Sequence, residues 1–89
     1  MESDYYEYNT FRGILSLNRN SENPNNWDLR LNGELIHSRY IDLNQAAFDI
    51  SRHDFGDEGL DELFQNIYVP SEIRFWRTTR SVYVKIKRL

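Results

Sequence analysis

The dipeptide Asn32-Gly33 constrains the fold of this chain more than any other feature of its sequence. It lies between two runs in which apolar and polar residues alternate, 27–31 and 34–40. Both of its residues tolerate the positive φ angles of a type I′ turn, so the pattern predicts a β-hairpin. A two-residue turn fixes the register, with the opposite pairs Leu31–Glu34, Leu29–Ile36 and Trp27–Ser38.

This register divides the hairpin into an apolar face and a polar face, because side chains alternate along a strand. The apolar face carries Trp27, Leu29, Leu31, Ile36 and Tyr40. The polar face carries Asp28, Arg30, His37 and Arg39. We expect the apolar face to be covered by another element of the fold.

Residues 42–54 change to helical spacing and supply that element. Asp42 is placed to cap the helix, and Gln45 is placed to complete a capping box. The apolar positions form one stripe, which consists of Leu43, Ala46, Ala47 and Ile50.

The residues before the hairpin predict one further strand and a loop. Residues 11–17 form the strand, with Phe11, Leu15 and Leu17 on its buried side and Gly13 marking a bulge or a close approach. Residues 1–8 are acidic and rich in tyrosine, and they are either a frayed terminus or a first edge strand. The asparagine-rich stretch 18–26 predicts a long loop, which is a legitimate place for function.

Two elements are expected after the central helix. A short helix over 58–66 would carry an apolar stripe of Leu60, Leu63, Phe64 and Ile67. Residues 73–88 are predicted to form a hairpin around a loop at 78–81, because this loop gathers Ile73, Phe75, Val82, Val84 and Ile86 on one face. A short helix beginning at Ser71 and a single long bent strand are the alternatives.

The predicted fold class is α+β, in one small domain that spans residues 1–89. An antiparallel sheet combines a three-strand N-terminal meander with the C-terminal hairpin, and one main helix and one short helix pack on one face. The chain has no cysteine, which excludes a disulfide framework and a thiolate metal site. Without an apolar run of about 18 residues or a signal peptide, we expect a soluble cytoplasmic protein without a membrane partner.

The net charge of −3 conceals a marked segregation of charge. All fourteen acidic residues lie before residue 73, whereas the six basic residues that follow have no acid among them. Pairing within the fold is the simpler explanation, and a functional surface is the alternative.

The sequence contains no motif that identifies a reaction. His37 and His53 are interpreted as an exposed strand residue and a helix-end residue. No HExxH motif, glycine-rich phosphate loop or serine elbow is present. We therefore expect neither an enzyme nor a cofactor or metal.

Two candidate surfaces remain. The first is an acidic patch of Asp54, Asp57, Glu58, Asp61 and Glu62, which helix-start acids largely explain and a basic protein surface could recognise. The second is a basic and aromatic face of Arg74, Trp76, Tyr83, Lys85 and Lys87, although Trp76 could instead be buried.

The leading hypothesis for function is a small protein-binding module, either an adaptor or a stoichiometric inhibitor, with an unidentified protein partner. The alternative is a nucleic-acid-binding protein that uses the basic and aromatic face. An acidic chain disfavours that alternative, because phosphate binding needs an uncompensated positive field.

Overall fold

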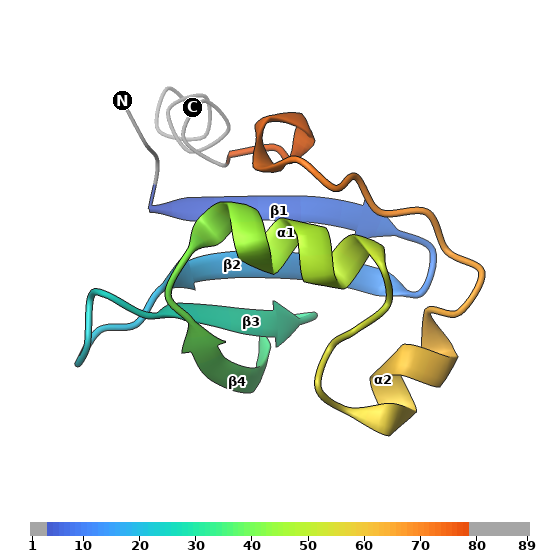
Figure 1. Cartoon of the computed structure of the whole chain (residues 1–89), viewed down its shortest axis with the longest axis horizontal. Coiled ribbons are helices and arrows are strands. Elements are labelled where there is room, and N and C mark those ends of the chain that lie inside the picture. Colours follow the sequence, from blue (N-terminus) through green and yellow to red (C-terminus); the bar gives the residue numbers. More distant parts are fainter. Residues whose placement is uncertain (1–3, 79–89) are drawn as a thin grey trace, which may run out of the picture.

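The computed structural model describes residues 4–78, which form an antiparallel sheet with helices packed against it (Figure 1). The strands are β1 (Tyr5–Thr10), β2 (Gly13–Arg19), β3 (Trp27–Leu31) and β4 (Glu34–Tyr40), and they neighbour one another in that order. The helices are α1 (Leu43–Ser51), α2 (Glu58–Leu63) and the 3₁₀ turn η1 (Ile73–Phe75). The α+β class is therefore confirmed. In this part of the chain, no helix is long and apolar enough to cross a bilayer.

The predicted three-strand meander is preceded by a further strand, β1, at the edge of the sheet. Tyr6 of β1 lies opposite Leu17 of β2 and is buried, and Tyr8 lies opposite Leu15 and packs partly against the core. Of the two possibilities for the N-terminal residues, the structure therefore contains the edge strand.

The prediction that Phe11 is a buried strand residue is wrong. Phe11 lies in the turn between β1 and β2, and its side chain is 88% exposed. Thr10 stabilises this turn, since its hydroxyl donates to the carbonyl of Gly13 (2.7 Å) and accepts from the backbone N–H of Arg12 (3.1 Å). A side chain placed at the tip of a hairpin has no neighbouring layer to bury it.

The β3–β4 hairpin has the expected turn but an irregular register. Asn32 and Gly33 have φ angles of 52° and 86°, and Leu31 lies opposite Glu34 as predicted. The register then shifts twice, so that His37 lies opposite Leu29 and Tyr40 lies opposite Trp27. The predicted pairs Leu29–Ile36 and Trp27–Ser38 are therefore wrong.

Side-chain hydrogen bonds accompany this shift in register. The hydroxyl of Ser38 donates to Asp28 across the hairpin (2.6 Å), and the ring of His37 bonds to the main chain of Phe55 (2.9 Å). An extra residue in one strand bends it and re-aims its side chains. The bulges of β4 thus allow His37 to reach Phe55 and Ser38 to reach Asp28.

Helix α1 covers the apolar face of the sheet as its pattern predicts. Its stripe is buried over core residues of the strands, which include Leu15, Leu17 and Leu29. The carboxylate of Asp42 accepts from the backbone N–H of Asn44 (2.9 Å) and caps the helix. The Gln45 side chain donates to Asp49 (2.8 Å), one turn further along.

The helix ends at Ser51, earlier than the predicted Asp54. His53 adopts a positive φ of 63°, and the N–H of Asp54 donates to the carbonyl of Asp49 (2.9 Å). These features close the last turn in the manner of a Schellman motif. His53 therefore supplies the left-handed residue that ends α1.

The segment after α1 completes the core with four buried apolar residues, Phe55, Phe64, Val69 and Trp76. The rings of Phe55 and Phe64 contact each other, with their centroids 5.1 Å apart. Phe64 and the half-buried Leu60 face inward as predicted. Helix α2 ends at Leu63, earlier than the predicted residue 66, and the side chain of Leu63, predicted on the apolar stripe, is 39% exposed.

The first strand of the predicted C-terminal hairpin is not formed. Ile73–Phe75 is a 3₁₀ turn, which is closer to the alternative of a short helix near Ser71. Only Arg77 pairs in a β-like manner, through two main-chain hydrogen bonds to Glu7 of β1. Residues 82–88, the predicted second strand, lie outside the described residues.

Burial of Trp76 explains this departure. Its indole N–H donates to the carbonyl of Pro70 (3.2 Å), and its ring contacts Tyr8, whereas Phe75 is 58% exposed. Trp76 is therefore buried and Phe75 exposed, which is the reverse of the faces predicted for them in the hairpin.

Candidate functional site

The basic and aromatic face is not assembled by the part of the chain that the structure describes. Trp76 is only 4% exposed, so it cannot act as an exposed anchor. Arg74 pairs with Glu72 (2.8 Å) and lies over the ring of Phe75 (4.8 Å). Tyr83, Lys85 and Lys87 lie outside the described residues.

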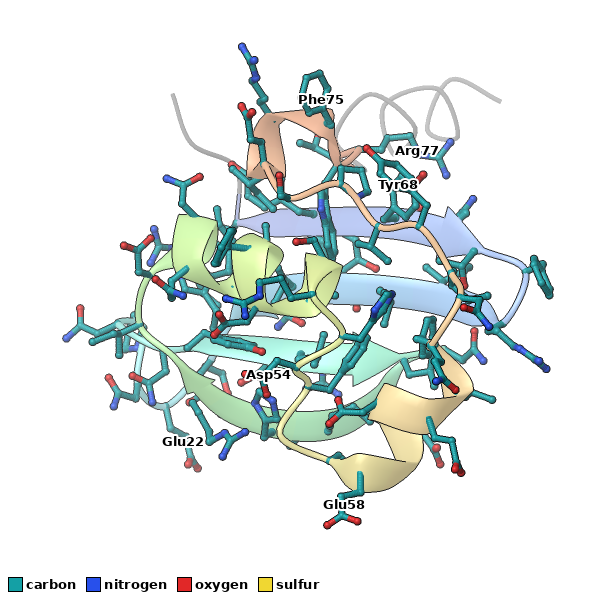
Figure 2. The ribbon with its side chains drawn as sticks, turned by 45° about the vertical axis from the view of Figure 1, so that its right-hand side comes forward. Glu22, Asp54, Glu58, Tyr68, Phe75 and Arg77 are labelled. Atoms are coloured by element: carbon teal, nitrogen blue, oxygen red, sulfur yellow. The ribbon has the colours of Figure 1, made fainter. Side chains whose placement is uncertain are left out.

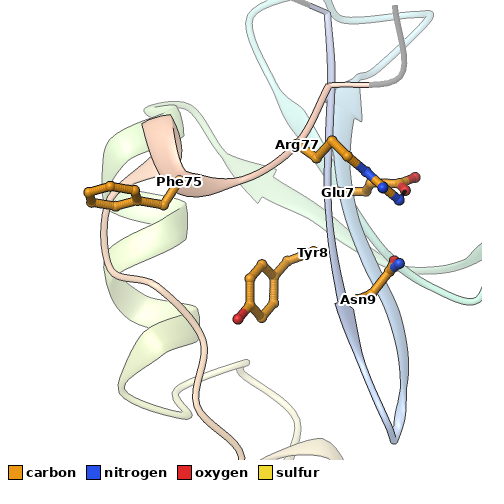
Figure 3. Close-up of a pocket in the computed structure, with 5 residues that line it drawn as sticks. All are labelled: Glu7, Tyr8, Asn9, Phe75 and Arg77. Carbon is orange, nitrogen blue, oxygen red and sulfur yellow. Dashed lines mark hydrogen bonds and ion pairs between the residues drawn. The ribbon is translucent and has the colours of Figure 1, made fainter. Parts of the chain in front are cut away.

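A hollow of about 240 Å³ lies next to this segment, between β1 and η1 (Figure 3). Its lining residues are Glu7, Tyr8, Asn9, Phe75 and Arg77. The carboxylate of Glu7 and the guanidinium of Arg77 form an ion pair at 2.8 Å. The two charges at this hollow therefore neutralise each other, and its other lining residues are the aromatic Tyr8 and Phe75 and the polar Asn9.

The acidic patch is divided between structural residues and exposed residues. The carboxylate of Asp57 caps α2 by accepting from the N–H of Leu60 (3.1 Å), and that of Asp61 accepts from the N–H of Phe55 (2.7 Å). Asp54, Glu58 and Glu62 are exposed, and so is the capping Asp57, whereas Asp61 is partly buried. Figure 2 shows Glu58 pointing away from the body of the protein.

A second hollow, of about 270 Å³, lies between the β1–β2 turn and α2. Its lining residues are Phe11, Arg12, Glu62, Leu63, Gln65, Asn66 and Ile67. An adjoining hollow of about 360 Å³ is lined by Glu58, Asp61, Glu62 and Gln65. Because the two share Glu62 and Gln65, we treat them as one surface and call it the α2 groove.

The α2 groove combines apolar contact area with negative charge. The exposed Phe11 and the partly exposed Leu63 and Ile67 supply the apolar area. The charged residues of the groove are three acids and one arginine, namely Glu58, Asp61, Glu62 and Arg12. The groove therefore has an excess of negative charge beside an aromatic side chain.

The fold holds both sides of this groove in place. Phe64, at the C-terminal end of α2, is fully buried against Phe55. Glu62 and Leu63 consequently face outward, because neighbouring positions of a helix point in different directions. On the other side, the Thr10 hydrogen bonds fix the turn that carries Phe11.

Sequence reasoning identified the acids of this groove but missed Phe11. The alternation of Tyr6 and Tyr8 offered a signal, because it is typical of a strand that ends before Gly13. A strand there would place Phe11 and Arg12 in a turn. The turn residues Phe11 and Arg12 are not typical turn formers, and this hid the signal.

His37 and His53 both bond to main-chain carbonyls. The Nε2 of His37 donates to Phe55 (2.9 Å), and the Nε2 of His53 donates to Ile67 (2.8 Å). His37 is half-buried, which corrects its prediction as an exposed strand residue. Burial lowers the pKa of His37 below its ordinary value, against the opposite effect of its hydrogen bond to Phe55. The position of His53 near the end of α1 agrees with its prediction.

The face of the sheet opposite α1 carries a polar network centred on Asp28. Its buried carboxylate accepts from Ser38 (2.6 Å), Asn20 (3.0 Å) and Arg30 (3.3 Å). Burial alone would raise the pKa of Asp28, but these hydrogen bonds and the Arg30 charge lower it below its ordinary value. The network therefore stabilises an ionised carboxylate.

The asparagine-rich loop is attached to this network. The side-chain oxygen of Asn20 accepts from the N–H groups of Glu22 (2.9 Å) and Asn23 (2.8 Å), while its amide donates to Asp28. Asn26 donates to the carbonyl of Ser38 (2.9 Å). These asparagines thus have local structural roles.

Among residues 4–78, no group of three or more histidine, aspartate or glutamate side chains is arranged to hold a metal ion. Comparison of the chain with protein-family models, curated proteins and solved structures gives no match.

Proposed function

We propose that this chain is a small, non-enzymatic protein-binding module whose α2 groove receives a basic segment with an apolar anchor. The observation that carries the proposal is the position of Phe11. Its side chain is 88% exposed at a hollow that also contains Leu63 and the carboxylate of Glu62. Aromatic residues, phenylalanine included, are enriched at the cores of protein interfaces.

The groove offers both affinity and selectivity to such a partner. Covering a side chain like that of Phe11 contributes roughly 1.5–3 kcal/mol of hydrophobic free energy. The acids Glu58 and Glu62 favour approach of a positively charged segment and disfavour an acidic one. We therefore expect a partner segment in which a large apolar residue is flanked by lysine or arginine.

Nucleic-acid binding through the basic and aromatic face is the alternative. The burial of Trp76 and the pairing of Arg74 with Glu72 and of Arg77 with Glu7 argue against it. Phosphate binding would have to compete with these acids. The same contacts leave the protein-binding proposal intact.

The proposal is tested by selecting displayed peptides from a random library on the immobilised chain. We expect the selected peptides to share a large apolar residue next to basic residues. Phe11→Ser should weaken the binding of a selected peptide by about tenfold or more, which corresponds to the loss of one hot-spot side chain.

Phe75→Ser supplies the matched control, because it also removes an exposed phenylalanine ring. Phe75 lies in η1, at the opposite side of the view from α2 (Figure 2). This variant should bind the selected peptides as the wild type does. Acidic consensus peptides, or peptides that bind the Phe11→Ser variant undiminished, would exclude the groove.

A further inference from the structure

The main chain of Phe55 is held from both sides. Its N–H donates to the carboxylate of Asp61 (2.7 Å), and its carbonyl accepts from the Nε2 of His37 (2.9 Å). Its ring is fully buried against Phe64. His37 thus attaches the segment that carries α2 to strand β4.

The other ring nitrogen of His37 has no partner among the described residues. Nδ1 is buried and accepts or donates no hydrogen bond. With the proton on Nε2, Nδ1 carries a lone pair, as a neutral imidazole requires. Protonation would place a charge in a half-buried site, which is unfavourable, and the N–H on Nδ1 would have the main chain of His37 itself as its neighbouring acceptor, which offsets part of this cost.

The groups around His37 come from three parts of the fold. On β4, the positive charge of Arg39 disfavours a charged ring. The ring of Tyr40 contacts the imidazole edge to face, with the two ring centroids 5.0 Å apart. Before α2, Asp57 favours the charged ring, and on β3 the opposite residue is the apolar Leu29. Burial outweighs Asp57, so the pKa of His37 is lowered.

We propose that His37 is a pH-dependent latch, which holds the segment from Phe55 to Ile67 on the sheet when neutral and loosens it when protonated. Local opening of the segment would separate Phe55 and Phe64 from a core whose other members include Leu15, Leu17, Leu29 and Ile50 of β2, β3 and α1. Acidification would therefore reduce the order of the α2 groove. That consequence for binding depends on the proposed function, whereas the latch itself does not.

Hydrogen exchange of the partner-free chain tests the latch directly. Protection factors, which correct for the intrinsic pH dependence of exchange, are compared between about pH 7.5 and about pH 5, where histidine changes its charge. We expect amides of residues 55–67 to lose protection, while those of Leu17 and Leu29 keep it. For each unit by which the pKa of His37 is lower in the closed state than in the open state, acidification can reduce these protection factors by about tenfold.

His37→Gln and His53→Gln are a matched pair of variants. Glutamine can donate to the Phe55 carbonyl but does not titrate, so His37→Gln should remove the pH dependence of protection in residues 55–67. His53 also bonds a main-chain carbonyl, that of Ile67, and His53→Gln should retain the wild-type pH dependence. Equal pH dependence in the wild type and in His37→Gln would overturn the proposal.

An NMR titration of the wild type gives a second measurement that requires no variant. The His37 resonances of the folded chain should titrate below the ordinary value of 6.5, and protection of residues 55–67 should fall as the pH drops from that value to the pKa observed for the folded chain. Titration at or above that value, or loss of protection in a different range, would contradict the latch.

Discussion

Asp28 connects strand β3 to strand β4 and to the asparagine-rich loop through the donors Ser38 and Asn20. Replacing its carboxylate by an amide leaves part of this buried network without an acceptor. We expect Asp28→Asn to lower the free energy of unfolding by about 1–3 kcal/mol at neutral pH. Urea titration of the two proteins measures this difference.

The same residue predicts a pH dependence of stability. The pKa of Asp28 is lowered in the folded protein, so the unfolded chain binds a proton first as the pH falls. The contribution of the carboxylate is complete above the ordinary value of 3.8 and is lost as the pH falls through the folded pKa. The stability difference between the wild type and Asp28→Asn should therefore shrink at acidic pH, and a constant difference would disprove this role.

Gly13, after the β1–β2 turn, lies against Leu31 and Asn32 at the β3–β4 turn. Its φ is 141°, and a Cβ atom built there would lie 2.8 Å from the side-chain nitrogen (Nδ2) of Asn32 and 2.9 Å from a methyl group of Leu31. Asn32 cannot move freely, because its side-chain oxygen accepts from the N–H of Ile14 (2.9 Å). We expect Gly13→Ala to cost about 2–3 kcal/mol, at the upper end of the range for backbone strain.

Gly33→Ala is the control for this substitution. Gly33 also has a positive φ, of 86°, but no atom lies within 4 Å of a Cβ built on it. Gly33→Ala should therefore lower the free energy of unfolding by only about 1 kcal/mol, the cost of a positive φ for a residue with a side chain. Equal losses in thermal unfolding of the two variants would mean that Asn32 and Leu31 yield to the added methyl group.

At the scale of the elements, α1 contributes to stability mainly through its buried stripe. Ile50 is fully buried between the helix and the sheet, whereas Ile41, just before the helix, is 76% exposed. We expect Ile50→Ala to cost about 2–5 kcal/mol. Ile41→Ala should change stability by less than about 0.5 kcal/mol. A loss below about 1 kcal/mol for Ile50→Ala would contradict the described packing of α1.

The attachment of the η1 segment depends on Trp76. Removal of its buried indole should cost about 3–5 kcal/mol of folding free energy. Phe75→Ala removes a neighbouring but exposed ring and should cost little. If Trp76→Ala unfolds at the same denaturant concentration as the wild type, the indole is not part of the core.

The elements differ in how far their sequences determine them. Helix α1 follows from the sequence because its 3.6-residue period and the Asp42 cap are local features. The bulges of β4 do not, since they accompany contacts of His37 and Ser38 with residues distant in the chain. The strand predicted at Ile73 failed for a similar reason, because contacts of Trp76 with Pro70 and Tyr8 decide which side of this segment is buried.

The candidate site divides in the same way. Acids such as Glu58 and Glu62 are evident from the sequence, because they belong to a dense run of acids from Asp54 to Glu62. The role of Phe11 is not, because it depends on a hairpin turn that lacks the usual turn residues and on the proximity of α2. Sequence alone therefore predicts the charge of the groove but not its apolar contact.

At the scale of the whole molecule, the described residues distribute their charge unevenly. The basic side chains of the C-terminal portion, Arg74 and Arg77, pair with Glu72 and Glu7. The acids around α2 retain exposed members beside Phe11. We therefore expect recognition on the α2 side of the molecule and not on the η1 side.

Affinity capture from native lysate, read by mass spectrometry, tests this assignment most directly when the wild type, Phe11→Ser and Phe75→Ser are compared with and without nuclease. We expect a protein that is captured by the wild type and by Phe75→Ser, remains captured after nuclease treatment and is lost with Phe11→Ser. Loss of all captured proteins on nuclease treatment, or equal capture by Phe11→Ser, would contradict this assignment.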